Sequence, residues 1–195
     1  MKRTKGTYLA LLAVLLSPMV NAEVITFNGT ASEGFFTFLN PGFTYSEAGY
    51  NLTVDSGATY FIDNNYDSDL LAFDDDVYEF DSDNSSATVV QEDGLLFDLI
   101  SVIIGSLNIS GNFVFTGIFG AGGSISQTVY STFTPTTFSF SGFTGLSSLM
   151  ISTTDGNYPV MDNLTVETSA VPEPGTLALL GLGLVGMAAR RRKTA

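Results

Sequence analysis

The chain of 195 residues contains no cysteine and no histidine. Without cysteine no disulfide can hold the fold together, so stability has to come from the burial of apolar side chains, among them 16 phenylalanines. Without histidine the chain cannot build a Ser-His-Asp or Cys-His site, and it cannot bind a transition metal through imidazole. Any catalysis would have to depend on carboxylates and hydroxyls alone.

Basic residues are absent from the whole interior of the sequence. The seven lysines and arginines lie within the first five residues and in the run 190–193. This excludes a Schiff-base lysine and an arginine clamp for phosphate. All 20 acids except Glu173 lie in residues 23–170, so this part of the chain repels nucleic acid. Calcium, a neutral polysaccharide or a basic partner would suit such a surface.

Residues 1–22 have the three parts of a secretory signal peptide. A basic start precedes an apolar run at 8–16, and Val20, Asn21 and Ala22 form a small-residue cleavage site. The run is too short for a permanent anchor, since a membrane span needs about 20 apolar residues. The sequence therefore predicts that signal peptidase cuts after Ala22 and that residues 23–169 form the exported domain.

Residues 170–195 combine three elements in a fixed order. Pro172, Glu173 and Pro174 form a rigid, non-helical motif, an apolar helix is expected at 177–189, and the basic stop 190–193 follows. A positive stop of this kind prefers the cytoplasmic side of a membrane. At about 1.5 Å per residue the helix is shorter than a hydrocarbon core of about 30 Å. Such a weakly held span suits a segment that is later removed.

This arrangement resembles the PEP-CTERM sorting signal of bacterial exported proteins. The resemblance implies export, transient retention in the inner membrane, and processing by an exosortase near Pro172, Glu173 and Pro174. The cell surface or the extracellular matrix would be the destination. The alternative that the residues leave open is a permanent anchor with a single span.

The exported domain has the pattern of an all-β protein. It is rich in Phe, Tyr, Thr, Val and Ile, and Gly, Asn, Asp and Ser interrupt it at short intervals. Phe113 and Phe115 alternate with polar or smaller residues, as do Phe138 and Phe140. The sequence predicts a single antiparallel β-sandwich of jelly-roll type, with about nine to eleven strands.

The last strand shows the clearest alternation. Its period of two places Val160, Leu164 and Val166 on one face and Met161 with Asn163 on the other. Asp162 then shares the inward face. A buried carboxylate needs hydrogen bonds or a metal, so Asp162 is expected either to cap backbone amides at a strand end or to bind a metal ion.

Five segments of this domain resemble the β-sandwich domain common in proteins with the same tail: 45–50, 96–102, 115–123, 138–146 and 161–166. Such domains are similar in topology to galactose-binding-like and carbohydrate-binding modules. The resemblance implies sugar binding, and it supplies no catalytic residues.

Residues 63–83 are strongly acidic and carry oxygen ligands at short spacing, which calcium prefers. Five of them match positions 1, 3, 5, 7 and 12 of an EF-hand-like loop: Asp63, Asn65, Asp67, Asp69 and Asp74. Ser68 replaces the usual glycine, Asp74 replaces the usual glutamate, and no helical pattern flanks the loop. One alternative is a solvated acidic hairpin whose carboxylates all point outward. Another is a sugar-binding surface, because the aromatics Tyr60, Phe61, Tyr66, Phe73, Tyr78 and Phe80 lie among the acids.

Three functions remain open on these grounds. The first is a non-enzymatic exported protein of the envelope or extracellular matrix that associates with exopolysaccharide. The second is a glycoside hydrolase that uses carboxylates alone, although the sequence shows no distinguishable pair of acids. The third is a structural or adhesion protein that needs calcium to fold. No cofactor other than calcium is predicted.

Overall fold

The computed structural model describes residues 22–32, 34–65, 73, 75–81, 84–107, 109–154 and 158–169. Within these residues every strand pairing is antiparallel and no helix is present. The predicted all-β antiparallel fold is confirmed. The predicted helices at the two ends of the chain lie outside the described residues.

The described residues form thirteen strands, more than predicted. Several are only four residues long, too short for a period of two to identify them. The strands are β1 (Ala22–Ile25), β2 (Phe36–Leu39), β3 (Thr44–Glu47), β4 (Tyr50–Ser56), β5 (Thr59–Ile62), β6 (Val77–Phe80), β7 (Ser86–Gln91), β8 (Phe97–Ser106), β9 (Asn112–Phe119), β10 (Ser124–Tyr130), β11 (Thr136–Ser139), β12 (Leu146–Thr153) and β13 (Pro159–Thr168).

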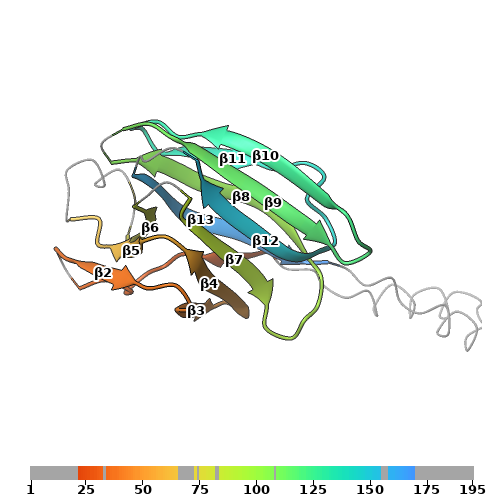
Figure 1. Ribbon diagram of the computed structural model, residues 1–195. Helices are drawn as coiled ribbons and strands as arrows, with labels where there is room; N and C mark the ends of the chain where they lie inside the picture. Colours follow the sequence, from red (N-terminus) through yellow and green to blue (C-terminus); the bar gives the residue numbers. More distant parts are fainter. Residues whose placement is uncertain are drawn as a thin grey trace, which may run out of the picture.

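The strands form one curled sheet whose two halves face each other as layers (Figure 1). The first layer has the order β2-β5-β6-β13-β8-β11, with β1 beside β13. The second has the order β3-β4-β7-β12-β9-β10. The layers join where Leu146 of β12 pairs with Phe97 of β8. From β7 onward the chain crosses repeatedly between layers, which is typical of a jelly roll.

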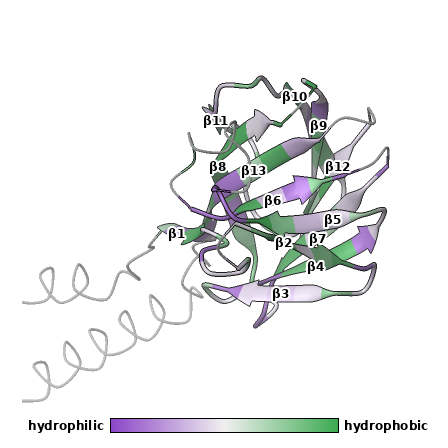
Figure 2. Ribbon diagram, turned by 90° about the vertical axis from the view of Figure 1, so that its left-hand side faces the viewer, coloured by the Kyte–Doolittle hydropathy of each residue, from purple (hydrophilic) through white to green (hydrophobic). Residues whose placement is uncertain are grey.

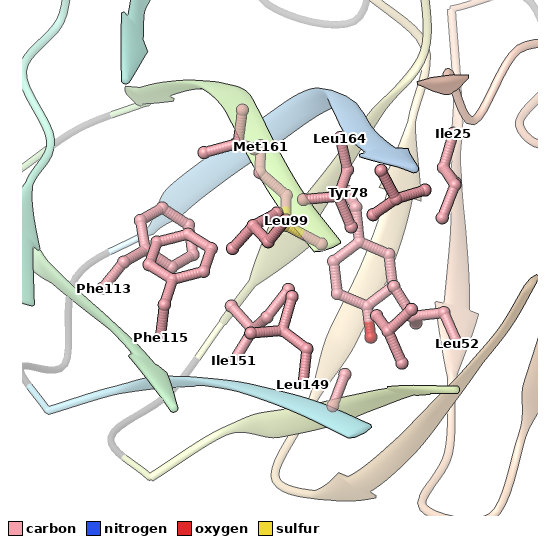
Figure 3. Packing of buried hydrophobic residues seen from close by; sticks show 14 of the residues in the cluster. Ile25, Leu52, Tyr78, Leu99, Phe113, Phe115, Leu149, Ile151, Met161 and Leu164 are labelled. Atoms are coloured by element: carbon pink, nitrogen blue, oxygen red, sulfur yellow. The ribbon is translucent and has the colours of Figure 1, made fainter. Parts of the chain in front are cut away.

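One hydrophobic core fills the space between the layers. In Figure 3, Leu99, Met161 and Leu164 lie opposite Leu149 and Ile151, which belong to the second layer. Phe113 and Phe115 are both fully buried here, and Phe138 and Phe140 pack against the same core, as their alternation predicted. Because the chain has no disulfide, burial of these rings is the main source of its stability.

A β-bulge in β13 reverses the alternation that the sequence predicted. The register with β8 shifts between Asp162 and Thr165, and Asn163 has a left-handed backbone with φ of 49°. Met161 therefore faces the main core together with Leu164, while Val160 faces outward. The predicted grouping of Val160 with Leu164 and Val166 is wrong, because the extra residue of the bulge turns the side chains that follow it to the opposite face of the sheet.

The outer face of the first layer carries a second, smaller cluster. Its buried members are Ile62, Phe73, Val77, Leu107 and Val160, and Tyr60, Ile103 and Tyr158 pack against them. The residue facing Phe73 is a glycine: a Cβ at Gly105 would lie 2.9 Å from the ring of Phe73. Phe73, from the acidic region of the sequence, thus covers part of the outer face of the sheet.

Candidate functional site

An aromatic face lies on the outer side of β2 and β5, next to the second cluster. We use this name for Phe36, Phe38 and Tyr60. Phe36 pairs with Ile62 and Phe38 pairs with Tyr60, while Phe61 points to the opposite side and enters the main core. Phe36 and Phe38 are 49 % and 48 % exposed. The position of β2 at the edge of its layer thus leaves two aromatic rings open to solvent.

Tyr60 is held in place between the two phenylalanines. Its ring centre lies 5.3 Å from that of Phe36 and 5.2 Å from that of Phe38, both in edge-on geometry. Its hydroxyl donates a hydrogen bond to Oδ2 of Asp81 at 3.0 Å. Burial, this hydrogen bond and the nearby acids raise the pKa of Tyr60 to about 12. Tyr60 thus stays a neutral hydrogen-bond donor.

Glu79 continues the row of residues that begins with the aromatic face. Phe38 pairs with Tyr60, Tyr60 with Glu79, and Glu79 with Val160, so neighbouring side chains in this row lie on one face of the sheet. Figure 2 shows β5, β6 and β13, which carry three of these residues, side by side. Glu79 is only 5 % exposed. Burial, together with the negative charge of Asp81, raises its pKa to about 8. At neutral pH the Glu79 side chain is therefore a neutral carboxylic acid that can donate a hydrogen bond.

Asp63 fixes the start of β2, the strand that carries Phe36 and Phe38. Its backbone N–H donates to the carbonyl of Phe35 at 3.1 Å, and its carboxylate accepts the backbone N–H groups of Gly34 and Asn65. These hydrogen bonds lower the pKa of Asp63 below its ordinary value. The described contacts of this carboxylate are those of a structural anchor for β2.

The predicted calcium set is placed only in part. Asp63 and Asn65 are described, whereas Asp67, Asp69 and Asp74 lie outside the described residues. Among the residues that the structure does describe, no group of three or more acids could hold a metal ion. The calcium site therefore stays a prediction.

The expectation that all carboxylates of the acidic stretch point outward is wrong. Asp76 and Glu79 are buried. Oδ2 of Asp76 accepts the backbone N–H of Ala31 at 2.7 Å and the hydroxyl of Thr30 at 3.2 Å. Local alternation could not show this, because the loop that Asp76 fastens lies more than forty residues earlier in the sequence.

Asp162 is buried, and it lies on the outer side of the sheet with Val160 rather than with Leu164. Its carboxylate accepts the backbone N–H of Asn163 at 2.6 Å and the side-chain N–H of the same residue at 3.0 Å. The expected amide-capping role is thus supported, but it occurs at a bulge inside β13 and not at a strand end. These bonds satisfy the carboxylate where the bulge opens the ladder.

The sequence identified one member of the aromatic face and missed two. Tyr60 was among the predicted surface aromatics, but Phe61, Tyr78 and Phe80 belong to the main core and Phe73 to the second cluster. Tyr66 lies outside the described residues. Phe36 and Phe38 were missed, although their spacing of two was a signal. Whether such a strand lies at an edge depends on long-range pairing.

The end of the chain gives the decisive comparison with known protein families. Residues 170–193 match the model of the PEP-CTERM protein-sorting motif. The chain carries a PEP-CTERM sorting signal. This motif implies an exported protein with a C-terminal membrane anchor. Within the part of the chain that the structure describes, no helix is long and apolar enough to cross a membrane. The signal peptide of 1–22 and the apolar helix of 177–189 remain predictions.

Ala22, the predicted cleavage point, is the first residue of β1 in this PEP-CTERM-bearing chain and pairs with Glu167. A cut after Ala22 would leave the next three residues of β1 to pair with β13. The predicted boundary is thus compatible with retention of this short strand.

The comparison with solved structures finds carbohydrate-binding modules. TmCBM61, solved with β-1,4-galactotriose, has 10% sequence identity and a TM-score of 0.41, over 63% of this chain and 90% of that one. The family 11 module of Clostridium thermocellum, solved with a mixed-linked tetrasaccharide, has 10% identity and a TM-score of 0.34, over 80% and 100% of the two chains.

The CBM22-1–GH10 portion of a Clostridium thermocellum xylanase, solved with xylohexaose, has 14% identity and a TM-score of 0.39, over 75% of this chain and 28% of that one. With TM-scores below 0.5, these structures assign neither a site nor a ligand to the PEP-CTERM-bearing chain. A comparison with curated protein sequences finds no match.

Proposed function

We propose that the protein is a non-enzymatic component of the cell envelope or extracellular matrix that binds a neutral polysaccharide through its aromatic face. The observation that carries this proposal is the row from Phe36 and Phe38 through Tyr60 to the carboxyls of Glu79 and Asp81. Apolar sugar faces stack on such rings, and sugar hydroxyls can donate hydrogen bonds to Asp81, which is less buried than Glu79. The net charge of −13 disfavours an anionic polymer.

Substitution of both exposed phenylalanines tests this proposal. The variant Phe36→Ala/Phe38→Ala should bind neutral polysaccharide at least about ten-fold more weakly, because losing the stacking of two rings costs more than about 1.4 kcal/mol. Retardation in affinity gels that contain β-glucan, xylan or galactan measures the change. Both rings are half exposed and lose mainly their edge-on contacts with Tyr60, so the melting temperature should fall by only a few degrees.

Phe133→Ala is the matched control for this experiment. Phe133 is 53 % exposed and precedes β11, far along the sheet order from β2. This variant should bind as the unmodified protein does. Equal retardation of the double variant and the control on every polysaccharide would contradict the role of the aromatic face.

The glycoside hydrolase alternative now has a candidate pair of acids: Asp81 directly follows the end of β6, two residues after Glu79, and burial raises the pKa of Glu79 to about 8. A carboxyl group whose pKa is raised in this way is typical of the general acid of a glycosidase. However, Glu79 is buried, so a glycosidic oxygen cannot reach it without displacement of its cover. We therefore assign the pair to support of the aromatic face, since Asp81 holds the hydroxyl of Tyr60 and Glu79 lies beside Tyr60. Release of reducing sugar that is lost in Glu79→Gln would reverse this assignment.

We further propose that an exosortase removes the anchor and releases the domain to the cell surface or matrix. Replacement of Pro172, Glu173 and Pro174 by alanine should leave the protein in the inner-membrane fraction at its uncut length. Immunoblots of fractionated cells measure this, with Thr194→Ala as a control outside the motif. Normal release of the triple variant would mean that the motif is not the processing signal.

A further inference from the structure

One half of the sandwich carries no charge at all. Residues 99–154 contain no acid and no base, although the chain has 20 acids. This segment supplies nearly all of β8 and the whole of β9 to β12. In Figure 1, β9, β10 and β11 lie together on the side away from β2, β3 and β5. The negative charge of the domain is therefore concentrated at the opposite side.

Strand β10 is an unprotected edge in this charge-free half. Among the residues that the structure describes, five strands pair with a single neighbour: β1, β2, β3, β10 and β11. Four of these are four residues long, and β1 and β3 contain a glutamate, while Pro135 precedes β11. Strand β10 has seven residues with no charge and no proline, and its register with β9 has no bulge. Natural proteins usually protect a long edge by one of these devices.

The hydrogen bonds of the β9–β10 hairpin show which groups of β10 are free for pairing. Phe119 donates its backbone N–H to the carbonyl of Gly123, and Ser131 donates its backbone N–H to the carbonyl of Gly111. Every second pair of residues between these two ends exchanges hydrogen bonds, and Gln127 with Phe115 is one of these pairs. Residues 124, 126, 128 and 130 alternate with these. Their backbone N–H and C=O groups therefore point away from β9, toward the free edge.

We propose that β10 is a self-association site at which a second copy of this chain pairs its own β10 in antiparallel register, with Gln127 on the two-fold axis. This register pairs the entire strand, since Ser124 then lies opposite Tyr130 of the second copy and Ser126 lies opposite Thr128. Two six-stranded layers become one continuous twelve-stranded sheet. An interface of this kind is closed and self-complementary.

The distribution of charge selects a second copy as the occupant. Two chains of net charge −13 repel each other through most orientations. Pairing through β10 brings the charge-free halves together and keeps the acidic halves at the far ends. Exposed apolar side chains also lie in this half, among them Ile118, Tyr130 and Met150, which are 40 %, 56 % and 39 % exposed. A polysaccharide lying along the edge is the competing occupant.

The absence of native cysteine makes cross-linking of the full chain a direct test. Two Gln127 residues on the axis form a non-hydrogen-bonded pair, in which the Cα atoms are about 4.5 Å apart. This lies within the ~4.4–6.8 Å range that a disulfide needs. The single variant Gln127→Cys, expressed as the full chain and oxidised, should give a reducible dimer on a non-reducing gel.

Two further variants distinguish specific pairing through β10 from cross-linking by random encounters in solution. Ser46→Cys places one thiol on β3, the other edge of the same layer, and should remain monomeric. Thr128→Pro removes an N–H that points to the free edge, so it spares the bonds to β9 and should abolish the dimer of Gln127→Cys. If that proline variant does not fold, Thr128→Lys should weaken the dimer through charge alone.

Three outcomes would overturn the proposal. The first is equal cross-linking of the Gln127 and Ser46 cysteine variants, and the second is cross-linking that both Thr128 substitutions leave unchanged in folded protein. The third is a monomer for every variant, in which case retardation of the full chain by polysaccharide, lost in Thr128→Lys, would assign the edge to the glycan instead.

Discussion

Glu79→Gln is expected to stabilise the protein by about 3 to 5 kcal/mol at pH 8. Burial raises the pKa of Glu79 from its ordinary value of 4.5 to about 8. Between these values the folded protein keeps a proton that the unfolded chain has lost. The stability of the unmodified protein therefore falls as the pH rises from about 4.5 to 8, and it is fully retained only below this range. Glutamine cannot ionise, so the variant does not show this fall.

Urea unfolding of both proteins at intervals from pH 4.5 to 9 measures the effect. The two stabilities should nearly coincide at pH 4.5 and separate progressively up to pH 8, with the difference constant above it. Glu92→Gln is a suitable control because Glu92 is exposed in the turn after β7. A glutamine variant that is less stable than the unmodified protein at pH 8 would show that Glu79 is ionised and hydrogen-bonded in the fold.

The cost of burying Glu79 has a physical explanation within the proposed function. A neutral carboxylic acid can donate a hydrogen bond, which an ionised one cannot. Glu79 is next to Tyr60 in the row of the aromatic face, and Tyr60 is also held as a neutral donor. Proteins can retain a destabilising group where it supports a binding site. The acidic stretch thus contributes a neutral donor where the sequence suggested a set of charged ligands.

The sequence predicted those features that depend on neighbouring residues. Alternation identified the buried faces at Phe113 and Phe115, and the order of motif, apolar stretch and basic run identified the sorting signal. These signals are local, so they can be read without knowing which strands pair. The class of fold follows from the same alternation and from the short spacing of turn residues.

The features that the sequence did not predict depend on distant contacts. The bulge at Asn163 is visible only in the register with β8, and it changes the face of Met161. Glu79 alternates correctly with Tyr78 and Phe80, but its burial requires residues such as Phe73 and Leu107 to cover the outer side of the sheet. The exposure of Phe36 follows from the edge position of β2. None of these contacts leaves a local pattern.

Glu47→Ala is expected to cost at least about 3 kcal/mol of stability, because one carboxylate serves four donors. It accepts the backbone N–H groups of Thr26 and Phe27 at 2.9 and 3.0 Å, and the hydroxyls of Thr26 and Tyr45 at 2.7 and 2.9 Å. Hydrogen bonds to a charged group contribute about 1.5–3 kcal/mol each, and unpaired buried donors add a penalty. Burial and this carboxylate also raise the pKa of Tyr45.

The position of Glu47 explains why this loss should affect the whole domain. The residue belongs to β3 in the second layer, whereas Thr26 and Phe27 follow β1 in the first. Phe27 is fully buried with a φ of 59°, and its ring lies 6.0 Å from that of Phe61, the neighbour of Tyr60. Glu47 therefore fastens the two layers together on the side that carries the aromatic face.

Thermal unfolding should show a decrease in Tm of roughly 6–12 °C for Glu47→Ala, given about 2–4 °C per kcal/mol for a domain of this size class. Glu47→Gln retains one oxygen acceptor and should lie between the two proteins. Glu92→Ala, at an exposed turn, should leave Tm unchanged. A Glu47→Ala protein that melts within a degree of the unmodified one would mean that water replaces the carboxylate as the hydrogen-bond acceptor of Thr26 and Phe27. The two layers would then be held together by the hydrophobic core alone.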